Sequence, residues 1–198
     1  MQPISDCRFP IVCLGGSAGS LEPYREILRH IPNDSGMAFV IVSHRAPDNP
    51  EMLGNLLSRA AQIPVIEITD AVPLAPACVF VKPARTDLTT DGLLLRMQTS
   101  SPRRGWPVDI SRFLLSLARV CSSRVVAVIL SGMGYDGSSA LRAVKVAGGT
   151  VFAQSDALYG DMPQCAIDTG YVDFTLSATK IGQRLAEMRP KSPPARGQ

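Results

Sequence analysis

The sequence lacks any uninterrupted apolar run near the roughly 18 to 20 residues that a membrane-spanning helix needs. Its first ten residues also lack the basic start and the long apolar stretch of a secretory signal. These absences argue against a secreted or membrane-inserted protein, and we expect a cytoplasmic location.

A strong excess of one charge is also missing. The formal net charge of +3 comes from the C-terminal tail, which contains Arg189, Lys191 and Arg196. The rest of the chain carries 17 basic and 17 acidic residues. Without a basic surface, binding to nucleic acid or to an anionic membrane surface is not indicated.

Cysteines are few, odd in number and never spaced as C-x-x-C. The five are Cys7, Cys13, Cys78, Cys121 and Cys165. This usage is typical of reduced thiols in a reducing compartment and not of a disulfide framework, and it offers no zinc site. Cys13 and Cys121 fall in or beside apolar segments, where a buried thiol behaves as a small hydrophobe.

What the chain does contain is an ordinary globular composition. It has 198 residues, of which 45% are apolar and 19% charged. That is enough for one sizeable domain, which we place at residues 1–188. Residues 189–198 are rich in proline and basic residues, and we expect a disordered tail.

Apolar strands and amphipathic helices alternate along the chain. We expect strands near 11–14, 38–42, 64–68, 125–130, 150–153 and 171–176, and helices near 21–30, 51–61, 109–121, 138–146, 162–168 and 178–188. This alternation predicts a three-layer, doubly wound α/β/α fold with a mostly parallel sheet. Strands at 79–81 and 93–97, with a turn over 89–92, predict an antiparallel hairpin excursion, followed by a surface loop at 98–105.

A glycine-rich turn follows the first strand and carries a single hydroxyl. The residues from Gly15 to Gly19 fit the G-x-S-x-G nucleophile elbow, in which Ser17 is exposed at the carboxyl end of the strand. Ser20 is a suitable N-cap for the following helix. Two alternatives remain, a closely packed turn of small residues and phosphate binding at the helix N-terminus, although the dinucleotide and Walker patterns do not match.

Two further polar residues follow strands of the predicted sheet. His44 comes just after the second strand and Asp136 after the strand at 125–130. Since the carboxyl ends of parallel strands share one edge, Ser17, His44 and Asp136 are expected to meet there. A hydroxyl, an imidazole and a carboxylate are the groups that acyl transfer requires.

Each residue also has a structural alternative. His44 could simply bond a carbonyl at the end of its strand, and Asp136 could cap the helix that begins near Ser138. The other histidine, His30, lies in the last turn of a helix, where exposed carbonyls explain a cation. The chain order Ser, His, Asp differs from that of the α/β-hydrolase fold.

The stretches at 15–22, 42–45, 128–137 and 147–154 resemble the chemotaxis-type protein-glutamate methylesterase domain, and the similarity extends over about 11–188. The resemblance implies hydrolysis of glutamate γ-methyl esters on the cytoplasmic helices of methyl-accepting chemotaxis proteins, often with glutamine deamidation. It implies Ser17 as nucleophile, His44 as general base, Asp136 as orienting carboxylate and the Met133 backbone N–H as an oxyanion donor. No metal or organic cofactor is implied.

The sequence also departs from the family pattern near the site. Ser20 replaces a usual glycine, Asp87 stands where a histidine is frequent, and Asp161 precedes Met162 and Pro163 in place of a glycine. Members of the family commonly carry an N-terminal receiver domain, whereas in the sequence given the resemblance begins at about residue 11. Two alternative functions therefore stay open: a catalytically diverged interaction or sensory module, and an esterase or amidase for a small molecule.

Overall fold

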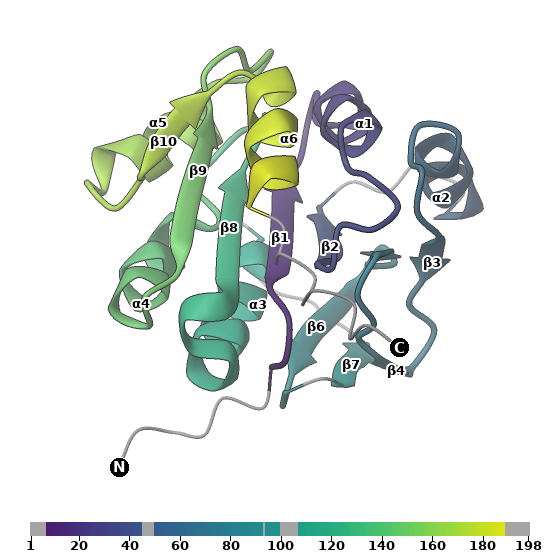
Figure 1. Ribbon diagram of the computed structural model, residues 1–198. Coiled ribbons are helices and arrows are strands. Elements are labelled where there is room, and N and C mark those ends of the chain that lie inside the picture. Colours follow the sequence, from purple (N-terminus) through teal and green to yellow (C-terminus); the bar gives the residue numbers. More distant parts are fainter. Residues whose placement is uncertain (1–6, 45–49, 93, 100–106, 189–198) are drawn as a thin grey trace, which may run out of the picture.

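A seven-stranded parallel sheet forms the centre of the protein (Figure 1). The computed structural model describes residues 7–44, 50–92, 94–99 and 107–188. The sheet has the order β10-β9-β8-β1-β2-β5-β3, and every neighbouring pair is parallel. Its strands are β1 (Ile11–Gly16), β2 (Ala38–Ser43), β3 (Val65–Glu67), β5 (Cys78–Val81), β8 (Val125–Ile129), β9 (Thr150–Gln154) and β10 (Phe174–Leu176).

Helices cover both faces of this sheet, which explains why its central strands are apolar without alternation. Every residue of β1, β2 and β8 is buried. One face packs against α1 (Leu21–Arg29), α2 (Pro50–Ser58) and α6 (Ala178–Glu187). The other packs against α3 (Asp109–Cys121), α4 (Leu141–Val146) and α5 (Asp161–Asp168). The predicted three-layer α/β/α fold is therefore confirmed.

The hairpin differs from the prediction in its strands. The segment at 79–81 belongs to β5, which pairs with β2 and β3 in the parallel sheet. The antiparallel partner of β7 (Leu94–Thr99) is β6 (Thr86–Thr90), and β4 (Ala71–Pro73) pairs with the other edge of β7. We missed β6 because its sequence is polar, and β4 because it is short and ends in proline.

Other boundaries shift by a few residues. The predicted helix at 138–146 is divided into a 3-10 turn, η2 (Ser138–Ala140), and α4. The short 3-10 turn η1 (Ser122–Arg124) lies between α3 and β8. The proposed tail at 189–198 and most of the loop at 98–105 lie outside the described residues.

The cysteine prediction was wrong for one pair, because Cys7 and Cys121 form a disulfide. Their Cα atoms are 5.1 Å apart although 114 positions separate them in the chain. Cys7 lies in the segment that precedes β1, and Cys121 is the last residue of α3. The two meet only through the fold, so spacing in the sequence could not reveal this pair. Cys13, Cys78 and Cys165 are free.

In the described ranges, none of the helices has the length and apolar character that crossing a membrane requires.

Candidate active site

The candidate site lies where the strand order reverses. In the sheet, β2, β5 and β3 lie on one side of β1, and the strands that come later in the chain, β8, β9 and β10, lie on the other side. Ser17 follows β1, His44 follows β2 and Asp136 comes after β8. The register pairs Gly16 with Ser43, so the two residues that follow emerge side by side at the carboxyl edge. This edge of an open parallel sheet is where such folds place their sites.

The glycines before Ser17 allow helices to approach the end of β1. A Cβ atom on Gly15 would lie 2.7 Å from Cγ2 of Ile110 in α3. A Cβ on Gly16 would lie 2.6 Å from the Cβ of Ser20 and 2.7 Å from the hydroxyl of Tyr24 in α1. Side chains at these positions would collide with both layers, which is the physical reason for the glycine pair.

The turn itself holds Ser17 half-buried. Its backbone N–H donates to the carbonyl of Ser131 at 2.9 Å, which joins the end of β1 to the loop after β8. Gly19 has a φ of +72°, as a tight turn of this kind requires. Ser20 is at the N-cap of α1, as expected, but its hydroxyl donates to the Ser17 carbonyl at 2.7 Å and makes no cap bond to the helix.

His44 and Asp136 are in direct contact. The Nε2 atom of His44 lies 2.6 Å from Oδ2 of Asp136, and both side chains are largely buried. Among the described residues, the Ser17 hydroxyl makes no hydrogen bond to this pair. His30 is elsewhere, at the C-cap of α1, with Nδ1 2.9 Å from the Glu26 carbonyl oxygen.

Asp136 is held by the start of α3 and not by the helix that follows it. Its Oδ2 accepts from the backbone N–H of Ile110 at 2.8 Å, and Oδ1 accepts from the backbone N–H and hydroxyl of Ser111 at 3.0 and 2.7 Å. Gly137 N–H adds a bond of 2.7 Å to Oδ1. The expected alternative, a cap on the helix near Ser138, is therefore incorrect, because Asp136 caps the N-terminus of α3 from outside.

These bonds decide the charge of Asp136. Burial raises its pKa, but the hydrogen bonds from His44, Ser111 and Ile110 outweigh that effect, and the pKa is lowered overall. An ionised carboxylate accepts from the Nε2–H of His44, which leaves Nδ1 unprotonated. The pair can therefore take a proton at Nδ1.

The loop after β8 places Met133 beside the serine turn. A Cβ on Gly132 would lie 3.0 Å from the Cβ of Ser17, and Met133 is the next residue. The backbone N–H of Met133 has no acceptor among the described residues. Gly134 has a φ of +87°, so the chain turns sharply after Met133.

Sequence reasoning missed Ser131 and Gln154, which fix this loop. Ser131 is fully buried, and its N–H donates to Oε1 of Gln154 at 2.9 Å. The Ser131 hydroxyl donates to the Ala18 carbonyl at 2.9 Å and accepts from the N–H of Tyr159 at 3.0 Å. One serine thus connects the turn after β1 to the loop that precedes α5.

Lys82, which is buried just after β5, is a second part of the site that the sequence analysis did not identify. Its Nζ donates to the carbonyl of Thr86 at 2.7 Å and lies 3.1 Å from Oδ2 of Asp109, the first residue of α3. The ammonium group thereby fixes the helix end that holds Asp136. Asp87, which replaces a frequent histidine, is paired with Arg112 of α3.

The residues present are suited to proton transfer and nucleophilic attack. In the described part of the chain, no group of three or more His, Cys, Asp and Glu side chains is placed to hold a metal ion. The fold and the site define a three-layer α/β/α protein with a serine, an imidazole and a carboxylate at one edge of its sheet.

Comparison with known proteins gives the family. The chain matches the CheB methylesterase family over residues 12–185, and it belongs to that family. It is similar to the crystal structure of the CheB methylesterase catalytic domain of Thermotoga maritima, with a TM-score of 0.83 and 29% identity, over 91% of this chain and 98% of that one.

Two curated relatives are named protein-glutamate methylesterase/protein-glutamine glutaminase. The protein from Carboxydothermus hydrogenoformans is 31% identical over 185 residues, which cover 89% of this chain and 54% of the relative. The protein from Syntrophomonas wolfei is 28% identical over 188 residues, with coverages of 90% and 53%. The chain thus spans about half the length of these relatives.

Proposed function

We propose that this protein hydrolyses methyl esters on glutamate side chains of proteins. The contact that carries the proposal is the 2.6 Å hydrogen bond between His44 and Asp136, at the sheet edge where Ser17 follows β1. The names of the two curated relatives and the family of the chain support the same activity.

In the proposed mechanism, Nδ1 of His44 accepts the hydroxyl proton as Ser17 Oγ attacks the ester carbonyl. The Met133 N–H donates to the oxyanion of the tetrahedral intermediate. As the intermediate collapses, His44 returns the proton to the departing oxygen and methanol leaves. A water molecule, deprotonated by His44, then attacks the acyl-enzyme. As this second intermediate collapses, His44 donates that proton to Ser17 Oγ, and the glutamate carboxylate and the serine hydroxyl are released. Asp136 stays ionised throughout and stabilises the imidazolium.

The substrates we propose are methylated cytoplasmic helices of methyl-accepting chemotaxis proteins. The relatives' second name, protein-glutamine glutaminase, motivates a second reaction in which ammonia leaves in place of methanol. The same acyl-enzyme would form from a glutamine side chain, so no additional residue is needed.

We propose that residues 1–188 act as one catalytic domain in the cytoplasm, without a metal or an organic cofactor. The buried residues on each face of the sheet include side chains of β1 and β8, so both layers of helices are packed against the same central strands.

The test measures the rate of methanol release from a methylated receptor fragment and compares the unaltered protein with the Ser17→Ala variant. Loss of the nucleophile is expected to reduce the rate by at least about a thousandfold. The matched control is Ser123→Ala, because Ser123 is exposed in η1 at the opposite end of β8. Full methanol release by Ser17→Ala would overturn the assignment.

A diverged interaction module is the second candidate, since Ser17 and His44 are not hydrogen bonded to each other in the described part of the chain. A fluorophosphonate separates the two candidates. Covalent mass gain at Ser17 supports the hydrolase, whereas an unreactive Ser17 together with retained receptor binding supports the module.

A further inference from the structure

Apolar side chains gather around the candidate site on two loops. Met133 and Tyr135 belong to the loop after β8, and Leu158 and Tyr159 belong to the loop before α5. We call these four residues the apolar collar. Leu158 is 76% exposed and Tyr135 52%, and the collar holds four of the seven exposed large hydrophobic residues in the described part of the chain. Such clustering on a surface is typical of an interaction site.

The collar is attached to the serine turn. The Gly132 N–H donates to the carbonyl of Tyr159 at 2.9 Å, which joins its two loops. A Cβ on Gly19 would lie 2.9 Å from a ring atom of Tyr159 and 3.2 Å from the Cβ of Leu158. Leu158 and Tyr159 therefore lie directly beside the turn that carries Ser17, where a bound protein segment can contact them.

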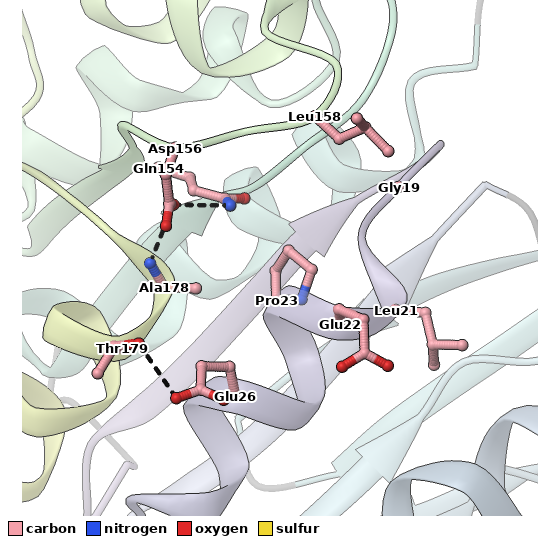
Figure 2. Close-up of a pocket in the computed structure, with 10 residues that line it drawn as sticks. All are labelled: Gly19, Leu21, Glu22, Pro23, Glu26, Gln154, Asp156, Leu158, Ala178 and Thr179. Atoms are coloured by element: carbon pink, nitrogen blue, oxygen red, sulfur yellow. Dashed lines mark hydrogen bonds between the residues drawn. The ribbon is translucent and has the colours of Figure 1, made fainter.

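A groove of about 440 Å³ continues from the collar, with Leu158 on the loop at one rim and α1 at the other (Figure 2). Its apolar wall includes Leu21, Pro23 and Ala178. Gly19 belongs both to this wall and to the serine turn. The volume suits one or two side chains of a docked segment and not a whole helix.

The charges of the groove are acidic. Glu22, Glu26 and Asp156 line it, and none of its ten lining residues is a lysine or arginine. The carboxylates of Glu22 and Glu26 are paired with arginines that lie outside the lining, whereas Asp156 accepts from the Gln154 amide and the Ala178 N–H. Asp156 is therefore the groove carboxylate without a lysine or arginine partner among the described residues, and it would attract a basic side chain and repel an acidic one.

The spacing fits an α-helix. Two peptide units separate Ser17 from Gly19, so their Cα atoms are at most about 7.6 Å apart. One helical turn rises about 5.4 Å, and residues four apart lie on the same face. A residue one turn from the reacting glutamate is therefore positioned for the collar and the mouth of the groove.

We propose that the apolar collar and the acidic groove form the docking surface for the substrate helix. The occupant is an amphipathic helix that carries the glutamate methyl ester, an apolar side chain one turn away and a lysine or arginine further along the same face. This inference rests on the proposed function and adds the part of the surface that selects the substrate.

The experiment compares two esters. One is a synthetic amphipathic helix with a central glutamate γ-methyl ester, a leucine four positions away on each side and a lysine three positions beyond each leucine. The other is N-acetyl-glutamate γ-methyl ester amide, which is too small to reach the groove. The measured quantity is the ratio of kcat/KM for the helix to kcat/KM for the small ester.

Leu158→Ser is expected to lower this ratio at least about tenfold, mainly through KM for the helix. The matched control is Val146→Ser, because Val146 is 81% exposed on α4, away from the collar. A helix in which glutamates replace both lysines is expected to react more slowly at low salt than at high salt. An unchanged ratio for Leu158→Ser, or an equal loss for Val146→Ser, would overturn the docking surface.

Failure of the proposed function gives a different result. If the protein hydrolyses neither ester, the esterase assignment fails before the ratio is measured. If it hydrolyses the small ester and Leu158→Ser does not change the ratio, the esterase stands and the docking surface is rejected.

Discussion

Replacing Ser111 with alanine should remove a hydroxyl that holds Asp136 in its ionised form. Five donors reach the two oxygens of this carboxylate, and the Ser111 hydroxyl is one of the closest, at 2.7 Å. The same hydroxyl accepts from the Gly137 N–H at 2.8 Å and from Ser139 at 3.0 Å. Alanine removes the bond to the carboxylate and leaves two donors without this acceptor.

The size of the stability loss in Ser111→Ala depends on the charge of the Asp136 carboxylate. A hydrogen bond to a charged group contributes about 1.5–3 kcal/mol to stability. Since a chain of this size loses about 2–4 °C of Tm per kcal/mol, the variant should melt about 3–12 °C lower at pH 7. The pKa of Asp136 should also rise toward its ordinary value, because one of the bonds that lower it is lost.

The contribution of Asp136 to stability depends on pH, and the direction follows from its lowered pKa. The folded pKa of Asp136 is below its unfolded value, so its contribution to stability is present above the unfolded pKa of about 3.9 and is lost as the pH falls through the folded pKa. The difference between the protein and Ser111→Ala should therefore be largest near neutral pH and shrink in acid.

The assay is urea unfolding across this pH range, with Ser116→Ala as the matched control. Ser116 is also on α3, and its hydroxyl donates to the Phe113 carbonyl and accepts from Thr90 N–H without touching Asp136. Its stability loss should not depend on the titration of Asp136. A loss in Ser111→Ala that is constant with pH would refute the electrostatic reasoning.

Three further changes test the packing at the site and elsewhere in the fold. Gly15→Ala should lower the free energy of unfolding by about 1–3 kcal/mol and reduce kcat, because its Cβ would displace Ile110, which donates to Asp136. Gly54→Ala in α2 should instead leave stability unchanged or raise it by up to about 1 kcal/mol, because an added Cβ would have no atom within 4 Å in the described part of the chain, apart from the backbone of its own helix. Reduction of the bond between Cys7 and Cys121 should lower the free energy of unfolding by about 2–4 kcal/mol, and thiol titration in denaturant should find three free cysteines before reduction and five after it.

The sheet was predictable because its central strands are apolar on both faces. β1, β2 and β8 are continuous apolar runs, and each is followed by turn-forming or polar residues. The placement of Ser17, His44 and Asp136 at one edge then followed from the rule for parallel strands.

The small sheet and the support of Asp136 were not predictable in the same way. β6 is held by backbone pairing to β7, and its polar residues give no apolar alternation. Ser111 is 25 positions from Asp136, so no local pattern joins them. The available signal was the N-terminus of the predicted helix at 109–121, because helix N-termini bind anions and a carboxylate at the nearby sheet edge is a suitable partner.

Substituting the two histidines in turn tests which imidazole acts as the general base and which has only a structural role. His44 is bonded to Asp136 at the sheet edge, whereas His30 contacts the Glu26 carbonyl at the end of α1. A general base contributes about 100-fold to 10,000-fold to the rate, so His44→Ala should lose that much kcat on the small ester. Added imidazole should restore part of the loss, since a free base can enter the space that the ring leaves. His30→Ala should keep kcat within about twofold, and circular dichroism should show that both variants are folded. Loss of activity in His30→Ala with retention in His44→Ala would contradict the assignment, because burial and the bond to Asp136 would then have identified the wrong imidazole.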